Sequence, residues 1–194
     1  MTIHRIHHND DFLTFEIPTR EVLNKLGREH PFHIDRSPKP YASVWSEPLN
    51  ISFTPMEAGK EAHMPDICAR NGRLFLNHKA YSALHSLLVS DGEFLPVAYE
   101  DGEGYLFNPL VVAEDLGMLD ESLTGYDQHG NLKHFSFLEN KLGDTVIFRA
   151  KIDNYYGVFC ADQLKEVIEK ANLTGVYFQS DLASFTGEPS LLNH

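Results

Sequence analysis

The feature of the sequence that most restricts the fold is an order of expected secondary-structure elements that occurs twice. Residues 74–76 form a short apolar run that ends at Asn77, a residue type that favours helix N-caps. Apolar side chains then recur at helical spacing as far as Gly92, and residues 93–99 are rich in β-formers. This order predicts a strand, a polar cap, an amphipathic helix of about three turns, a glycine and a second strand, which is the size of one supersecondary unit.

The second occurrence covers residues 158–178, with Asp162 as the expected N-cap and Gly175 before the closing strand. Either the chain duplicates one unit, or it contains two similar units by chance. In both cases the mixture of helices with hairpin-connected strands predicts the α+β class. We expect a mainly antiparallel sheet with two or three amphipathic helices. At 194 residues, the chain is long enough for one core and is taken as a single globular domain, 1–194.

Other segments have local signals of their own. A short helix is expected from Thr19 to Gly27, two short strands over 42–46 and 49–53, and a loop-rich connection over 54–73. Residues 93–99 and 105–112 are expected to pair as a hairpin around Asp101-Gly102, a dipeptide that tolerates positive φ. Apolar residues alternate over 146–152, which predicts a strand with one face in the core.

The charge is unevenly distributed along the chain. The formal net charge is −12, yet residues 1–79 sum to zero and residues 133–194 sum to −2. Between Lys79 and Lys133 there is no Lys or Arg. Ten carboxylates lie in this stretch: Asp91, Glu93, Glu100, Asp101, Glu103, Glu114, Asp115, Asp120, Glu121 and Asp127.

An acidic surface repels phosphates, so we expect no binding to nucleic acid or to anionic membranes. A basic protein is the expected partner of such a surface. The alternative is that the carboxylates only keep the domain soluble.

The sequence carries no signal of export. Its first twenty residues lack a basic segment followed by an apolar run, and no apolar run approaches the roughly 20 residues that cross a bilayer. We therefore expect a cytoplasmic protein, in which Cys68 and Cys160 are reduced and buried.

No familiar catalytic or cofactor signature is present in the sequence, including phosphate-binding glycine loops, nucleophile elbows and C-x-x-C or H-E-x-x-H motifs. His4, His7 and His8, and the pair His30 and His33, have spacings that occur in metal sites, but no matching Cys or Glu pattern accompanies them. We predict no catalytic residue, no cofactor and no metal.

Residues 92–110, with the blocks 147–160 and 164–178, resemble the immunity proteins of bacterial polymorphic toxin systems, a family typified by a myxobacterial immunity protein and formerly described as a domain of unknown function. The resemblance covers roughly residues 74–180. It implies a non-enzymatic protein that binds one cognate toxin and blocks it, often encoded beside a secretion-system effector such as those of type VI secretion. It carries no fixed set of binding residues, and residues 1–70 do not take part in it.

Three hypotheses follow. The first is an immunity protein that occludes a basic toxin or effector domain which acts in the cytoplasm. Its expected partner-binding carboxylates are Asp91, Glu93, Glu100, Asp101, Glu103, Asp120 and Glu121. Its candidate aromatic anchors are Tyr99, Tyr105, Tyr126, Tyr155 and Tyr156.

The second hypothesis is a hydrolase or transferase whose active site matches no sequence motif. Its residues could be, for example, Glu93, Asp120 and His134. The third is a homodimer that pairs through exposed strand edges near Pro96 and Pro109.

Overall fold

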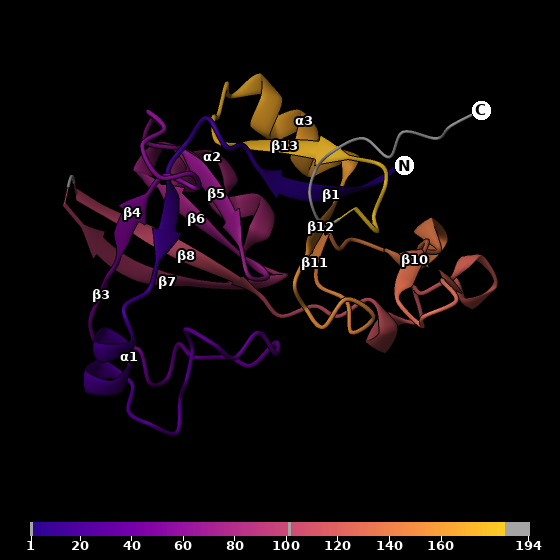
Figure 1. Ribbon diagram of the computed structural model, residues 1–194, viewed down its shortest axis with the longest axis horizontal. Helices are drawn as coiled ribbons and strands as arrows, with labels where there is room; N and C mark the ends of the chain where they lie inside the picture. Colours follow the sequence, from indigo (N-terminus) through magenta and orange to yellow (C-terminus); the bar gives the residue numbers. More distant parts are fainter. Residues whose placement is uncertain (1, 101, 185–194) are drawn as a thin grey trace.

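The computed structural model describes residues 2–100 and 102–184. Figure 1 shows two sheets that lie next to each other, with helices packed where they meet. The described part of the chain has three α-helices: α1 (Thr19–Lys25), α2 (His78–Leu88) and α3 (Asp162–Lys170). The protein has a small single-domain α+β fold, as the sequence predicts.

The larger sheet has five strands in the order β3-β7-β8-β6-β5. Neighbouring strands are antiparallel, except that β3 runs parallel to β7. The bounds are β3 (Leu49–Asn50), β5 (Ile67–Arg70), β6 (Arg73–Asn77), β7 (Gly92–Tyr99) and β8 (Gly102–Pro109).

The smaller sheet has four antiparallel strands in the order β11-β12-β1-β13. Its strands are β1 (Ile3–His8), β11 (Ile147–Phe148), β12 (Val158–Ala161) and β13 (Val176–Gln179). Because β1 pairs with β13, the first and the last strand of the described chain are neighbours in this sheet.

Short elements complete the fold. Two antiparallel ribbons pair β2 with β4 and β9 with β10. These strands are β2 (Thr14–Glu16), β4 (Ser52–Thr54), β9 (Gly125–Tyr126) and β10 (Leu132–His134). The 3-10 helices are η1 (Glu114–Leu116), η2 (Glu121–Leu123) and η3 (Glu139–Lys141).

The two sheets share one topology. In the first unit (β5, β6, α2, β7, β8), helix α2 connects two parallel strands, and the antiparallel strand β8 lies between them. In the second unit (β11, β12, α3, β13, β1), helix α3 does the same, and β1 takes the place of β8. The repeated sequence plan therefore corresponds to a repeated topology, in which the inserted strand comes from opposite directions along the chain.

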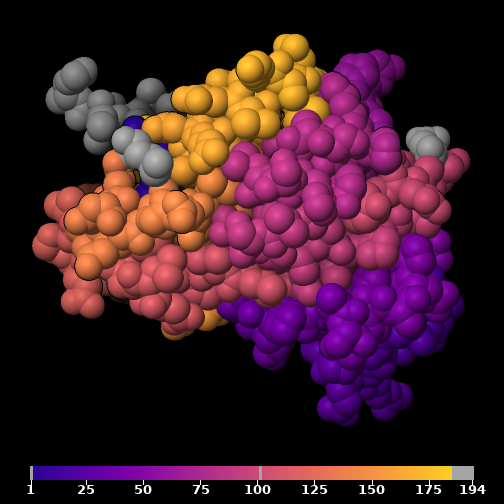
Figure 2. Space-filling model, turned by 180° about the vertical axis from the view of Figure 1, so that it is seen from behind, coloured from indigo at the N-terminus to yellow at the C-terminus, as the bar shows by residue number. Residues whose placement is uncertain are grey.

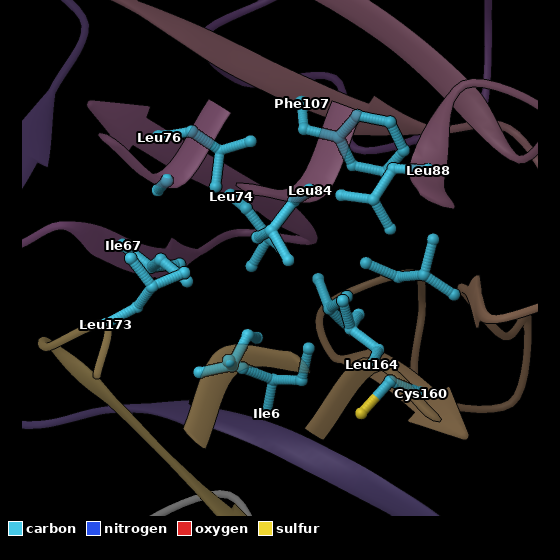
Figure 3. Packing of buried hydrophobic residues seen from close by; sticks show 14 of the residues in the cluster. Ile6, Ile67, Leu74, Leu76, Leu84, Leu88, Phe107, Cys160, Leu164 and Leu173 are labelled. Carbon is cyan, nitrogen blue, oxygen red and sulfur yellow. The ribbon is translucent and has the colours of Figure 1, made fainter. Parts of the chain in front are cut away.

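Three apolar clusters hold the fold together. The central cluster joins both units, since it contains Leu74 and Phe107 from the larger sheet, Leu84 from α2, Leu164 from α3 and Ile6 from the smaller sheet (Figure 3). A second cluster lies between the larger sheet and the segment 15–51, which includes α1. A third lies between the other face of the smaller sheet and the segment 113–142. Each sheet is thus covered on both faces.

Two N-caps were expected from the sequence, Asn77 for α2 and Asp162 for α3. The Asn77 side chain accepts a hydrogen bond from the Ala80 amide at 2.9 Å, which confirms the cap of α2. The prediction for α3 was wrong by one residue, because Ala161 is the N-cap. Asp162 instead accepts from the Thr2 amide and lies 2.8 Å from His4 Nε2, so it anchors the start of β1.

Other local predictions have mixed outcomes. The helix from Thr19, the 93–99 and 105–112 hairpin strands and the strand at 49–53 are confirmed in outline, the last as the separate strands β3 and β4. Residues 42–46 do not form a strand: 42–44 are a turn, and Trp45 after it packs into the second cluster. The connection 54–73 contains β5, which the sequence did not predict.

The predicted strand over 146–152 was too long, and the prediction of one core face and one solvent face was wrong. Only Ile147–Phe148 is a strand, and its two side chains enter different clusters. Arg149, expected on a solvent face, is completely buried. It donates to the backbone oxygen of Arg36 at 2.7 Å and to the Asn108 side-chain oxygen at 3.0 Å. These partners hold the two terminal nitrogens of the guanidinium, whereas its Nε is buried without a hydrogen-bond partner among the described residues.

Candidate functional site

The tip of the β7–β8 hairpin retains part of the predicted acidic surface. Glu100 and Glu103 are exposed, whereas Asp101 lies outside the described residues. In the hairpin register, Glu103 pairs with Ala98 and Tyr105 pairs with Pro96. Because side chains alternate along a strand, Glu103 and Tyr105 lie on the same face of the sheet. This face is the one that α2 covers farther from the tip.

Aromatic side chains lie next to these carboxylates. Tyr81, from the first turns of α2, stacks on Tyr105 with ring centroids 4.0 Å apart and planes at 18°. Phe94 meets the Tyr81 ring edge-on at 5.2 Å. All three rings are half-buried. We call the surface formed by Tyr81, Phe94, Glu100, Glu103 and Tyr105 the hairpin face; it belongs to the side of the molecule on which α2 and the hairpin adjoin in Figure 2.

The other candidate anchors are not part of this surface. Tyr99 packs edge-on against Phe53 and Phe75 in the second cluster. Tyr126 is 60% exposed, but it lies on β9. Tyr155 and Tyr156 belong to the turn before β12. Tyr81 was not proposed from the sequence, although its helical position beside Leu84 could have indicated that it borders the sheet.

Asp91 is not a surface carboxylate, which corrects its assignment to partner binding. Its side chain is buried, with 4% exposure. One carboxylate oxygen accepts hydrogen bonds from the backbone amides of Val146 at 2.7 Å and Ile147 at 3.1 Å. Burial raises the pKa of this carboxyl, while the two amides oppose the shift. Asp91 therefore ties the start of β7 to the start of β11.

Glu93 is also committed to the structure of the protein. Its carboxylate accepts from the backbone amides of Tyr41 at 2.7 Å and Ala42 at 2.9 Å, and from the Asn108 side chain at 2.7 Å. These three bonds fix the chain at residues 41–42 against the larger sheet. Glu93 thus has a structural role, and its assignment to partner binding stays a prediction.

Asp120 and Glu121 lie in the segment between β8 and β11, at the end of the molecule opposite to the hairpin tip (Figure 1). The Asp120 carboxylate accepts from the amide of Ser122 at 3.0 Å and from its hydroxyl at 2.6 Å, which caps η2. Glu121 is exposed. The predicted acidic residues thus do not form one continuous surface.

The remaining carboxylates of the acidic stretch have structural partners near this second location. Glu114 accepts from the amides of Lys151 and Ile152, and Asp115 forms an ion pair with the Lys151 ammonium. Asp127 accepts from the amides of His129 and Asn131 and so closes the β9–β10 turn. These three carboxylates of the acidic stretch therefore interact with nearby backbone amides and with one lysine.

The residues named for the enzymatic hypothesis are not brought together. No hydrogen bond or ion pair within residues 2–100 and 102–184 joins Glu93, Asp120 and His134. His134 lies on β10, where its ring packs against Gly125. Within the same residues, no group of three or more His, Cys, Asp or Glu side chains is arranged to hold a metal ion.

The strand edges named for the homodimer hypothesis are covered. The Trp45 indole donates to the Pro96 oxygen at 2.9 Å, and β3 pairs with β7 from Val97 onward. Pro109 ends β8, which has β7 on one side and β6 on the other.

Both cysteines are free and buried, as predicted. Burial raises the pKa of the Cys68 thiol to about 11 and also raises that of Cys160. Neither thiol is activated as a nucleophile.

A cavity of about 660 Å³ lies where the C-terminal end of β1 meets the β5–β6 turn and the loop before β12. Arg5, His7 and Arg70 contribute to its lining. None of these residues was proposed as functional from the sequence, because the three come from two strands that are distant in the chain and only the sheet topology brings them together.

Among the residues that the structure describes, no helix has both the length and the apolar character needed to cross a membrane. The sequence matches no protein-family model and no curated protein.

Proposed function

We propose that this protein is an immunity protein, which binds and neutralises a cognate toxin or secreted effector domain in the cytoplasm by occlusion through the hairpin face. The observation that carries the proposal is the stacked pair Tyr81 and Tyr105, half-buried at the surface beside the exposed carboxylates Glu100 and Glu103. The family resemblance of residues 74–180 supports the same function.

The composition of the hairpin face is suited to a protein partner. Binding energy at interfaces is concentrated in a few aromatic or arginine side chains, which are surrounded by polar residues that contribute less. Tyr81 and Tyr105 have the amphipathic rings typical of such anchors, and their mutual stacking holds them in place before binding. They would contact the centre of the interface.

The two carboxylates indicate the sign of the charge on the partner's surface. No Lys or Arg occurs in sequence between Lys79 and Lys133, so the hairpin carries no internal compensation for Glu100 and Glu103. Exposed carboxylates of this kind accelerate association with a cationic surface and repel nucleic acid. A toxin that acts on nucleic acid has such a cationic surface, since it must bind phosphates.

The proposal is tested by retention of partners from the protein's own cells at low and moderate salt, followed by mass spectrometry. We expect one basic protein to be retained in stoichiometric amount, and less of it as the salt concentration rises. The variant Tyr105→Ala should weaken the binding free energy by about 2 kcal/mol or more, the usual size of a hot-spot effect, and so reduce retention.

Charge reversal provides the matched comparison. Glu100→Lys with Glu103→Lys should reduce retention and its salt dependence. Glu121→Lys with Asp144→Lys introduces the same charge at two exposed positions away from the hairpin and should have little effect. Equal behaviour of the two double variants, or retention of no basic protein at either salt, would contradict the proposal.

A further inference from the structure

The cavity between the two units has the size of a small-molecule site. Its volume is about 660 Å³, within the range of roughly 300 to 1,000 Å³ that is typical of ligand pockets. It lies where β1 approaches β5. Contacts between separate parts of a fold are common positions for binding sites.

The lining contains basic side chains, although the whole chain is acidic. Two arginines, Arg5 and Arg70, line the cavity, against one aspartate, Asp10. The two histidines of the lining are neutral at neutral pH, because burial lowers the pKa of both His7 and His8. Because Arg5 is paired with the buried Asp153, Arg70 is the basic side chain of the lining that can attract an anion.

The two arginines are held firmly by the protein. Arg5 is 3% exposed; it donates to the Leu182 oxygen at 2.7 Å and lies 3.3 Å from the Asp153 carboxylate. Arg70 is more exposed and donates to the Phe15 oxygen at 2.8 Å, with the Glu16 carboxylate 3.8 Å away. A guanidinium has five N–H donors, so these contacts orient Arg70 without using all of its donors, while Arg5 is held in a buried ion pair with Asp153.

His7 contributes an unsatisfied polar atom to the same lining. It is 8% exposed, and its ring stacks on Tyr177 with centroids 5.2 Å apart. Its Nε2 is buried and has no hydrogen-bond partner among the described residues. Leaving a buried polar group unpaired costs about 1–3 kcal/mol, and a ligand that bonds to this ring would recover part of that cost.

Two neighbouring turns contribute Asn71 and Tyr156 to one wall of the cavity, and both turns contain residues with positive φ. Asn71 has φ of 51°, and Asn154 and Tyr155 have φ of 55° and 59°. The turns touch, since a Cβ added at Gly72 would lie 2.2 Å from the Tyr155 oxygen. Backbone strain of this kind persists only where the surrounding structure enforces it, and it is frequent at ligand sites. The wall is therefore formed in advance of binding.

We propose that this cavity binds a small organic anion, whose carboxylate or phosphate group contacts Arg70 and whose apolar part lies against Tyr156 and Met56. These last two side chains line the cavity and are 45% and 56% exposed. The site is separate from the hairpin face, so the proposal does not depend on toxin binding.

The test uses the full chain and two probes of similar size and opposite charge, phenyl phosphate and benzylamine, followed by amide and imidazole NMR shifts. Phenyl phosphate should cause saturable shifts at His7, Asn71 and Gly157, whereas benzylamine should not. Arg70→Gln should weaken phenyl phosphate binding about tenfold or more, the usual effect of losing a charge-assisted hydrogen bond. Arg70→Lys should retain part of the affinity.

The control variant is Arg20→Gln, which removes the same charge from an exposed position on α1. It should leave phenyl phosphate affinity unchanged. The proposal is overturned if phenyl phosphate and benzylamine give equal shifts, if neither phenyl phosphate nor benzoate gives saturable shifts at these residues, or if Arg70→Gln and Arg20→Gln bind alike. Retention of the basic partner by Arg70→Gln would keep this outcome distinct from that of the proposed function.

Discussion

The two units of this protein have the same topology but differ in where the inserted strand comes from. In the first unit β8 follows β7 directly through a hairpin, so the whole unit is continuous in sequence. In the second unit β1 joins strands that begin about 150 residues later. The first unit can therefore be assembled from local contacts, whereas the second depends on the closure of a long loop.

The difference also determines the chemistry of each unit. Strand β8 has no basic residue and begins at the acidic hairpin face. Strand β1 brings His4, Arg5 and His7 into the interior of the smaller sheet, where all three are buried. The same position in the topology is thus apolar in one unit and basic in the other, and the cavity forms beside the basic one.

The largest expected effect comes from removal of β1. A variant that lacks residues 1–9 loses the central strand of the smaller sheet and the buried side chains of Ile3 and Ile6. Loss of each large buried side chain costs about 2–5 kcal/mol, against a total stability of about 5–15 kcal/mol for a typical domain. We expect no cooperative unfolding transition in circular dichroism.

A circular permutant is the control for this deletion. It begins at Asp10 and carries residues 1–9 after residue 194 through a flexible linker, which makes the second unit continuous like the first. The register pairs Arg5 with Gln179, so the new connection joins neighbouring strands. The permutant should regain cooperative unfolding. A deletion variant that unfolds like the intact protein would refute the dependence of the second unit on β1.

Asp91 tests how the units are joined. Asp91→Ala leaves the amides of Val146 and Ile147 without their acceptor. We expect a loss of about 2–4 kcal/mol in the free energy of unfolding, measured by denaturant titration, because unsatisfied buried groups cost about 1–3 kcal/mol each. Asp91→Asn keeps one oxygen as an acceptor and should lose less. Equal losses for the two variants would show that the hydrogen bonds are not the cause.

Acid should weaken the second unit before the first. Burial and the charge of Arg5 lower the pKa of His7 to about 4, whereas Asp181 opposes the shift. The folded state therefore resists a proton that the unfolded state accepts, so the contribution of His7 to stability is complete above about pH 6.5 and falls as the pH approaches 4. The loss is on the order of 3 kcal/mol.

Hydrogen exchange measures this difference between the units. Between pH 6.5 and 4, amides of β1 and β12 should lose protection before those of β8, which contains no histidine. His7→Gln should flatten the dependence of stability on pH. Simultaneous loss of protection in both sheets would contradict the separate acid response of the second unit.

The smallest effect is expected at the hairpin tip. Glu103 is exposed, and its neighbours do not depend on its carboxylate for a hydrogen bond. Glu103→Gln should change the free energy of unfolding by less than about 0.5 kcal/mol. Glu93→Gln, in contrast, weakens the acceptor of two amides and should destabilise measurably in the same denaturant titration. Equal effects would mean that the hairpin face is also structural.

Sequence reasoning succeeded where the signal is local. The local signals are Asn77, the apolar spacing of α2, Gly92 at the start of β7 and Gly175 before β13, and each determines its element within a few residues. It failed for β1 because Ile3 and Ile6 point into different clusters, so no simple alternation of apolar and polar residues marks the strand. The burial of His4 and Arg5 depends on partners more than 140 residues away.

The candidate site was predicted less well than the fold. A count of carboxylates does not distinguish Glu103, which is exposed, from Asp91 and Glu93, which accept backbone hydrogen bonds from residues about 50 positions away. Tyr105 was proposed from its position beside the hairpin, but its stacking partner Tyr81 depends on the register of α2 against the sheet. The cavity depends entirely on the meeting of two sheets.

The position of β1 has a consequence for the order of events during synthesis. Both neighbours of β1, the strands β12 and β13, are made only after about 150 further residues. At the usual rate of roughly 5–20 residues per second, β1 waits on the order of ten to thirty seconds before its partners emerge from the ribosome. During that interval the first unit can fold, while both edges of β1 remain open to wrong partners.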